Sequence, residues 1–158
     1  MELEAGKFKR YIRMRNFILL LCATILFPFC QKGKTDREKM DEYVAAQNLH
    51  GQYTSTGLYY TVDVPGTGGN PKVSNTVKVE YSGYLLDGTK FDGTASGSPI
   101  EFGLSQVILG WQEGIPQFQK GGKGKLLIPS ALGYGSRSAG SIPANSVLVF
   151  DVYLVDWH

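Results

Sequence analysis

Short strand-forming runs separated by turn signals dominate the sequence from residue 56 onward, and this pattern most limits the folds open to the chain. The clearest run is Thr76–Leu85, in which apolar and polar residues alternate. Successive side chains of a strand point to opposite faces, so Val77, Val79 and Tyr81 share one face. The run therefore predicts a strand that is buried on one side.

Four further runs are rich in strand formers and are bounded by turn residues. An emphatic turn signal, Pro65-Gly66-Thr67-Gly68-Gly69, ends the first of them, and Asp87-Gly88 marks a tight turn into the second. In the last run Leu148, Phe150, Val152 and Leu154 share a face. The four predicted strands are Thr56–Val64, Thr89–Asp92, Lys123–Pro129 and Ser146–Trp157.

One helical pattern interrupts these strands. Val107, Trp111, Ile115 and Phe118 recur at steps near four, whereas Gly110, Gly114 and Pro116 keep the predicted helix short. Antiparallel strands with a single short helix covering one face make an α+β fold. The 158 residues suffice for one domain with an appendage.

Charge is divided unevenly along the chain. Before residue 17, five basic residues face two acidic ones, which gives this segment a net charge of +3. The remainder has eleven basic and twelve acidic residues, a net charge of −1. A near-neutral domain lacks the basic stripe that phosphate recognition requires, so nucleic acid is not an expected partner.

The N-terminal residues have the order of an export signal. Basic residues precede the uncharged apolar run Phe17–Cys30, and a polar segment follows it. The run is shorter than the roughly 20 residues that cross a bilayer. Pro28 also disfavours the alternative of a buried core helix. We expect residues 1–30 to be a signal peptide, with translation starting at Met1 or at Met14, and the mature protein to be exported to the bacterial cell envelope.

Both cysteines lie in this segment, at Cys22 and Cys30. A disulfide or a thiolate metal site within the domain is therefore excluded. Leu26–Cys30 resembles a lipobox, although Phe29 replaces the usual small residue. Cys30 is thus a candidate lipidation site and the only expected link to a membrane; alternatively, it is discarded or left free.

Residues 31–55 are expected to be a tether followed by a short helix. Asp36–Asn48 contains good helix formers without Gly or Pro. Two alternatives are open for this helix: it packs on the surface of the domain, or it is a short relative of the dimerising stalks that some exported proteins carry. The domain itself is expected at residues 56–158.

The sequence lacks the usual catalytic groups. His50 and His158 are the only histidines, and they lie in a linker and at the end of the chain. A Ser/His/Asp triad, a histidine metal site and a phosphate-binding loop are all missing. An enzyme with this sequence would work by shape and local electrostatics, and we expect no metal and no cofactor.

Five motifs, in order over about 100 residues, resemble the signature of FKBP-type peptidyl-prolyl cis-trans isomerases. They include a strand tyrosine, a Phe-Asp pair and a helix tryptophan. The motifs are Val79-Glu80-Tyr81-Ser82-Gly83 with Asp87-Gly88-Thr89-Lys90-Phe91-Asp92, Val107–Gly114, Leu132-Gly133-Tyr134-Gly135, Ile142-Pro143-Ala144-Asn145, and Leu148–Val152.

The resemblance implies a curved antiparallel sheet wrapped around the short helix, with a shallow apolar pocket between them. It assigns catalytic roles to Asp92, Tyr134 and Tyr81, with Asp92 as the one carboxylate of the pocket. The backbone N–H of Ile108 and the hydroxyl of Tyr134 would bind substrate carbonyls. The substrate-binding residues implied are Phe91, Phe102, Val107, Ile108, Trp111, Ile142 and Phe150.

Proline-containing polypeptides are the partners that the resemblance implies, and the macrolides tacrolimus and rapamycin are possible inhibitors. Gln106 replaces a commonly acidic residue, and Ile100 replaces a commonly aromatic one. The loop from Gly93 to Ser98 is short and has no arginine to pair with Asp92. Ser141 stands where many members have an aliphatic residue. These departures bear on macrolide affinity more than on turnover. A second function stays open, that of a binding module with the same pocket and little turnover.

Overall fold

The strand with the clearest alternation is an interior strand of an open antiparallel sheet and lies next to its edge strands. The computed structural model describes residues 33–158, of which Lys34–His158 form one compact unit. β3 (Thr76–Leu85) pairs with β7 (Leu148–Trp157) along one edge. Its other edge pairs with β4 (Lys90–Gly93) near one end and with β5 (Ile100–Gly103) near the other.

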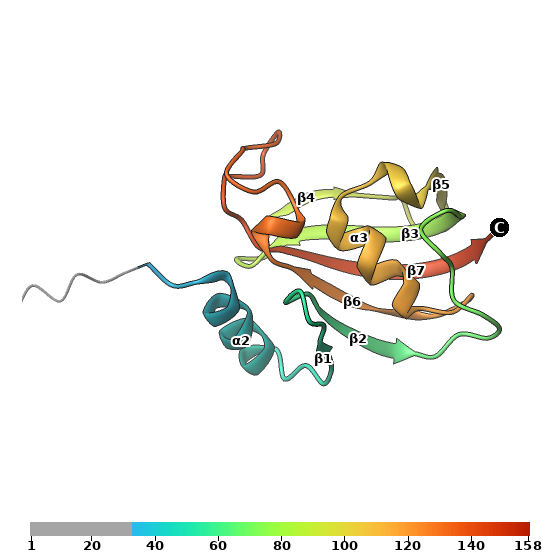
Figure 1. Cartoon of the computed structure of the whole chain (residues 1–158), viewed down its shortest axis with the longest axis horizontal. Helices are drawn as coiled ribbons and strands as arrows, with labels where there is room; N and C mark the ends of the chain where they lie inside the picture. Colours follow the sequence, from blue (N-terminus) through green and yellow to red (C-terminus); the bar gives the residue numbers. More distant parts are fainter. Residues whose placement is uncertain (1–32) are drawn as a thin grey trace, which may run out of the picture. The chain divides into compact units, whose positions relative to one another are not determined.

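The remaining strands extend the sheet beyond β7. β6 (Lys123–Ile128) pairs with β7, β2 (Tyr59–Val64) pairs with β6, and β1 (Gln52–Tyr53) pairs with β2. The order is β1-β2-β6-β7-β3-β4, with β5 beside β3, and every pairing is antiparallel (Figure 1). The predicted α+β fold is confirmed.

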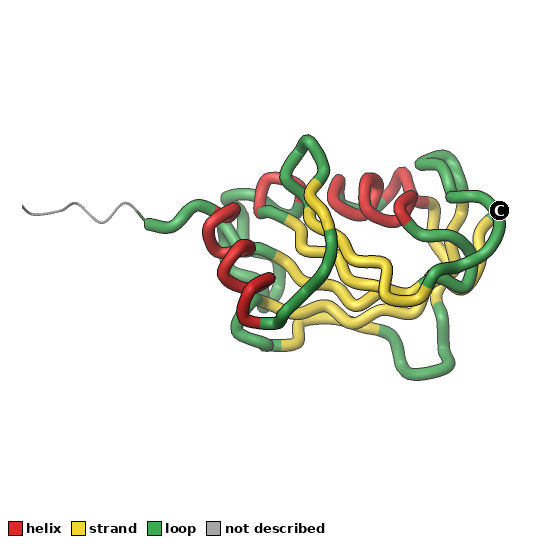
Figure 2. Tube along the Cα trace, turned by 90° about the horizontal axis from the view of Figure 1, so that it is seen from below, coloured by secondary structure: helices red, strands yellow, loops and turns green. Residues whose placement is uncertain are grey.

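One face of the sheet is covered by α3 (Leu109–Gly114), which η1 (Leu104–Gln106) precedes and η2 (Ile115–Gln117) follows (Figure 2). A Cβ on Gly110 would lie 2.3 Å from Cγ2 of Ile128, and one on Gly114 would lie 2.7 Å from Cδ1 of Leu126. The glycines therefore do more than shorten the helix, because they let its backbone rest directly on β6. Under α3 lies the main core: Leu58, Val77, Val79, Leu104, Trp111, Ile115, Phe118, Leu126, Ile128, Ile142, Leu148, Phe150, Val152 and Leu154.

A second, smaller core lies on the opposite face of the strands, as the alternation of Leu126 with Leu127 and of Leu148 with Val149 requires. Its buried residues are Met40, Tyr59, Leu127, Val147 and Val149. Met40 comes from α2 (Asp36–Ala46) and is fully buried. The helix predicted at Asp36–Asn48 is therefore packed on the domain, which was the first of the two alternatives.

Three local differences from the predicted elements have physical causes. β2 starts at Tyr59 and not at Thr56, because the chain turns at Gly57, whose φ of 92° favours glycine. α2 ends at Ala46, before Asn48 takes a φ of 50°. β1 and β5 were not predicted, since strands of two and four residues are too short for a periodic signal.

The predicted signal segment 1–30, with Cys22 and the candidate lipidation site Cys30, lies outside the described residues. Within residues 33–158, no helix has the length and apolar character needed to cross a bilayer.

Candidate functional site

Trp111 forms the floor of an aromatic cluster between α3 and the sheet. Its side chain is 5% exposed, and three aromatic rings surround the indole. The centroid distances are 5.0 Å to Tyr81, 5.3 Å to Phe102 and 5.2 Å to Phe150. Tyr81 and Phe150 meet the indole at interplanar angles of 85°, the edge-to-face geometry that aromatic rings favour. The floor is therefore held rigidly from three strands, β3, β5 and β7.

A cavity of about 510 Å³ opens above this floor. Its lining is mainly apolar, and Asp92 is its only carboxylate. Eight of the predicted site residues line it, together with Ile100 and Gln106. The lining residues are Tyr81, Asp92, Ile100, Phe102, Gln106, Val107, Ile108, Trp111, Tyr134 and Phe150.

Two predicted substrate-binding residues, Phe91 and Ile142, are not part of this lining. Phe91 packs edge-to-face against Phe150, at a centroid distance of 5.5 Å, and fills the space left by Gly83. Ile142 is buried in the main core, with 6% of its side chain exposed. Phe91 therefore packs against the lining residue Phe150, and Ile142 belongs to the buried core.

Tyr81 and Asp92 form a hydrogen-bonded pair at the cavity. The Tyr81 hydroxyl donates to Oδ2 of Asp92 over 2.7 Å, and the backbone N–H of Gly93 donates to Oδ1 over 2.8 Å. Burial raises the pKa of Tyr81 above its usual value, and the hydrogen bond to the Asp92 carboxylate raises it further. The phenol therefore stays protonated and keeps the exposed carboxylate in a fixed orientation.

The turn before α3 presents backbone groups to the cavity. Nε2 of Gln112 donates to the carbonyl oxygen of Val107 over 2.8 Å. Because a trans peptide is planar, fixing this carbonyl also fixes the N–H of Ile108 in the opposite direction. Gln112 was not predicted as a site residue. The only sequence signal that could have indicated it is its position one helical turn after Ile108.

Tyr134 lies on the rim, two residues after η3 (Ser130–Leu132), and the residue is 42% exposed. The two glycines that flank it donate their backbone N–H groups to the carbonyl oxygen of Ser130, Gly133 over 3.0 Å and Gly135 over 2.8 Å. This loop geometry holds the hydroxyl beside the cavity without deep burial of the ring.

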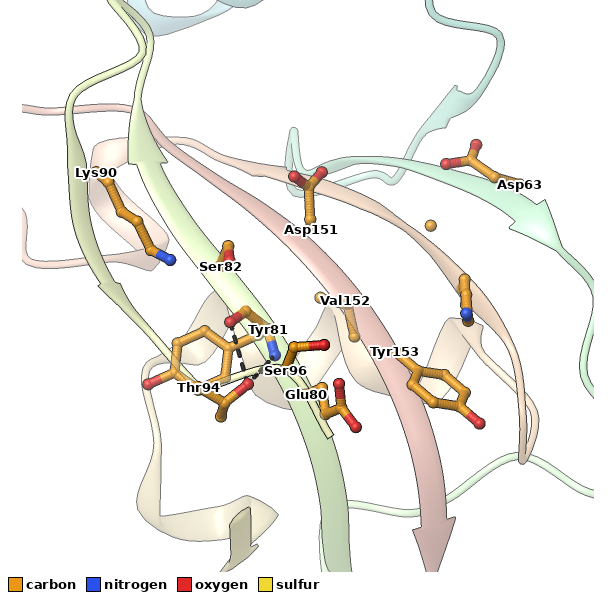
Figure 3. Close-up of a pocket in the computed structure, with 12 residues that line it drawn as sticks. Asp63, Glu80, Tyr81, Ser82, Lys90, Thr94, Ser96, Asp151, Val152 and Tyr153 are labelled. Carbon is orange, nitrogen blue, oxygen red and sulfur yellow. Dashed lines mark hydrogen bonds between the residues drawn. The ribbon is translucent and has the colours of Figure 1, made fainter. Parts of the chain in front are cut away.

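A different hollow, of about 560 Å³, lies on the opposite face of the sheet, and most of the residues that line it have polar or charged side chains (Figure 3). Acidic and basic side chains are mixed there, and Lys125 and Asp151 form an ion pair beside it. It offers no free aromatic ring to a ligand, since the ring of Tyr81 packs on Trp111 and the ammonium of Lys123 lies 4.5 Å from the centroid of the Tyr153 ring. The aromatic cavity is therefore the better candidate site.

Across residues 33–158, no group of three or more His, Cys, Asp or Glu residues is placed to ligate an ion. The aromatic cavity has an indole floor, one carboxylate oriented by the Tyr81 hydroxyl, the hydroxyl of Tyr134 at its rim and one oriented N–H. Such a site is suited to holding an apolar ring and two carbonyl groups, and it does not require a covalent step.

Comparisons with known proteins agree with this geometry. A family model for FKBP-type peptidyl-prolyl cis-trans isomerases matches residues 68–155. The chain is 48% identical over 133 residues to the isomerase FkpA of Aeromonas hydrophila, covering 78% of this chain and 50% of that protein. It is 48% identical over 126 residues to FkpA of Escherichia coli (strain K12), covering 79% and 45%. The chain thus spans about half the length of the curated relatives it matches.

Solved structures show the same fold. The crystal structure of FkpA from Escherichia coli superposes with a TM-score of 0.71 and 35% identity, covering 99% of this chain and 74% of that chain. The crystal structure of AtFKBP13 superposes with a TM-score of 0.63 and 34% identity, covering 68% and 98%.

Proposed function

The chain belongs to the family of FKBP-type peptidyl-prolyl cis-trans isomerases, and from this premise we propose that its cavity over Trp111 catalyses cis/trans isomerisation of peptide bonds that precede proline. One observation carries the proposal: the indole floor and the oriented carboxylate of Asp92 line the same apolar cavity. The proline ring packs on the indole of Trp111, and X-Pro bonds are suitable because they populate both isomers appreciably.

The chemistry needs shape and polarity and no bond cleavage. Rotation about a peptide bond costs about 18–20 kcal/mol, because amide resonance is lost in the twisted state. The planar amide is strongly polar, whereas the twisted form behaves more like a separate ketone and amine. A water-poor aromatic cavity therefore favours the twisted form over the planar one, which is differential binding of the transition state.

Polar groups at the edges of the cavity orient the substrate. We assign the backbone N–H of Ile108 to one substrate carbonyl and the hydroxyl of Tyr134 to another. The hydrogen bond from Gln112 to the Val107 carbonyl supports the first role, and the place of Tyr134 on the rim supports the second. Together they hold the chain on both sides of proline while the central bond turns.

Asp92 acts electrostatically in this proposal. Its carboxylate either faces the amide carbon and nitrogen as their charge redistributes, or shapes the cavity through the bond from Tyr81. A general base has no task here, since the reaction removes no proton. Both roles need the carboxylate in a fixed orientation, which the donors Tyr81 and Gly93 provide.

Proline-containing polypeptides are the proposed substrates, and tacrolimus and rapamycin are candidate inhibitors of the same cavity. Ile100 and Gln106 line this cavity and differ from the residues common in the family. We therefore propose that these two residues change the affinity of the cavity for macrolides. Competition between a macrolide and an X-Pro peptide measures this. Loss of competition on Trp111 substitution assigns both ligands to the cavity.

We further propose that the protein assists folding in the bacterial cell envelope, with Cys30 acylated as the mature N-terminus. The basic residues and apolar run before Cys30 support this proposal. Mass spectrometry of the native protein tests it. An acylated Cys30 at the N-terminus is expected, and cleavage elsewhere or an unmodified Cys30 would contradict the anchor.

The isomerase function is tested with a short peptide that contains one X-Pro bond. Exchange between the isomers is followed by NMR in the presence of a chelator, without a coupled protease. We expect the wild-type protein to accelerate this exchange and a Trp111 substitution to abolish the acceleration. Binding of the peptide without faster exchange would instead identify a binding module.

A further inference from the structure

We propose that Asp36, at the start of α2, is a positioning residue for Tyr134 and acts through the backbone of Ser130. The inference rests on the proposed function, because it concerns the placement of a hydroxyl that we assign to the substrate. It connects a helix outside the aromatic cavity with the rim of that cavity.

The connection begins with one hydrogen bond between distant parts of the sequence. The backbone N–H of Ser130 donates to Oδ2 of Asp36 over 2.8 Å, although the two residues are 94 positions apart. The side chain of Asp36 is only 21% exposed, and Nζ of Lys39 lies 3.1 Å from its other oxygen. A hydrogen bond to a carboxylate is stronger than one between neutral groups.

Ser130 passes this constraint to the loop through its carbonyl group. Its oxygen accepts the N–H groups of Gly133 and Gly135, which are the residues on either side of Tyr134. The backbone of Tyr134 is therefore held from both sides by one residue, whose own N–H is held by Asp36. Because Tyr134 is an exposed residue, with 42% of its surface accessible, packing around it constrains it weakly, and the hydrogen bonds of its backbone neighbours contribute more to its position.

The other end of the connection is fixed as well. The hydroxyl of Thr35 accepts the N–H of Glu38 and the Glu38 carboxylate accepts the N–H of Thr35, which completes a capping box at the start of α2. One turn later, Met40 is fully buried in the second core. Because the burial of Met40 holds α2 against the domain, Asp36 remains a fixed anchor even when the cap at Thr35 is removed.

The test compares two substitutions of Asp36 with a control in the same helix turn. Asp36→Ala removes the acceptor, whereas Asp36→Asn keeps a side-chain oxygen that accepts the Ser130 N–H. Thr35→Ala removes the cap of the same helix, and among the described residues no hydrogen bond joins Thr35 to the loop after Ser130. Each variant is made in the full chain, kept in mild detergent.

We expect Asp36→Ala to lower kcat/KM for an X-Pro peptide about two- to tenfold, the range of one lost hydrogen bond. Asp36→Asn restores most of the loss, and Thr35→Ala leaves turnover near that of the wild type. In a Tyr134→Phe background, Asp36→Ala costs much less, because the hydroxyl it positions is already absent. An equal loss in both backgrounds, or an equal loss in Thr35→Ala, would overturn the proposal.

Amide hydrogen exchange of Gly133 and Gly135, measured by NMR, tests the same connection without reference to activity. Asp36→Ala should accelerate exchange at both amides, whereas Thr35→Ala should not. Unchanged exchange in Asp36→Ala would overturn the proposal even if turnover falls. A wild-type chain that does not isomerise the peptide would refute the proposed function, and the exchange measurement would still decide whether Asp36 positions the loop.

Discussion

The hydroxyl of Tyr81 donates a 2.7 Å hydrogen bond to the carboxylate of Asp92. The two residues come from neighbouring antiparallel strands, β3 and β4, in which Gly83 is paired with Asp92. The ring of Tyr81 also meets Trp111 edge-on, at a centroid distance of 5.0 Å. One side chain therefore links the aromatic floor of the cavity to its only carboxylate.

Tyr81→Phe tests the contribution of this link. The substitution keeps the ring against Trp111 and removes one of the two donors to Asp92, so we expect turnover to fall about two- to tenfold. The unfolding free energy should change by roughly 0.5–1.5 kcal/mol at most. Peptide isomerisation and urea unfolding of the same samples check both values. If Tyr81→Phe kept the turnover of the wild type, the hydrogen bond from the Tyr81 hydroxyl would not be needed to orient Asp92.

Trp111→Ala tests the platform itself. Removing a buried indole leaves a cavity, and we expect a destabilisation of about 3–5 kcal/mol together with loss of peptide binding. Trp111→Phe is the matched control, since it keeps an aromatic surface. It should lose less stability and less peptide affinity than Trp111→Ala. Calorimetric unfolding and peptide titration measure the two effects. Full peptide affinity in a folded Trp111→Ala protein would exclude the indole as the proline platform.

Gly114→Ala tests the direct contact of α3 with β6. An added Cβ would lie 2.7 Å from Cδ1 of Leu126, closer than real contacts allow. We therefore expect a loss of about 1–3 kcal/mol in unfolding free energy, despite the better helix propensity of alanine. At Gly69 an added Cβ would lie 3.6 Å from Cζ2 of Trp157, an ordinary contact, so Gly69→Ala is the control. Equal stability of the two variants would contradict the close packing of α3.

The stability contributed by Asp36 should depend on pH. Burial acts to raise the pKa of its carboxyl, but hydrogen bonding by Ser130 and the charge of Lys39 outweigh it, so the pKa lies below the ordinary value of 3.8. The folded state then binds fewer protons than the unfolded state. The carboxyl therefore stabilises the fold above its unfolded pKa, and this contribution is lost as pH falls through the folded pKa.

Urea unfolding of the wild type and Asp36→Asn, from about pH 7 down to about pH 2, measures this contribution. The difference in unfolding free energy should be constant above the ordinary pKa of 3.8 and should shrink below it. The other carboxyl groups titrate in both proteins and cancel in the comparison. A difference that grows on acidification would reverse the assigned direction of the pKa.

The sequence predicted the central elements because their patterns are local. The alternation in Thr76–Leu85 gave β3 its bounds as found in the structure, and the apolar face Leu148, Phe150, Val152 and Leu154 lies in the main core as expected. Strands with complete alternation and clear turn signals leave little choice of register. The family resemblance pointed to eight of the cavity-lining residues, and seven of these lie within the motifs, Phe102 being the exception.

What the sequence did not predict depends on long-range packing. Val149 lies between two core residues of β7 and is itself fully buried, because Met40 of α2 covers the other face of the strand. Phe91 was expected in the cavity, but its ring occupies the space beside Gly83 and packs edge-to-face against Phe150. The bond between Asp36 and Ser130 joins residues 94 positions apart and has no local pattern at all.

The most direct test of the account compares the wild type with Asp92→Leu and Tyr134→Phe, by peptide isomerisation and thermal unfolding on the same samples. Asp92→Leu keeps an apolar shape and removes the exposed carboxylate, so turnover should fall at least about tenfold, which is 1.4 kcal/mol in the barrier, while the protein stays folded. Tyr134→Phe should lose about two- to tenfold with an unchanged unfolding temperature. Wild-type turnover in both folded variants would contradict the assignment of this cavity as the active site.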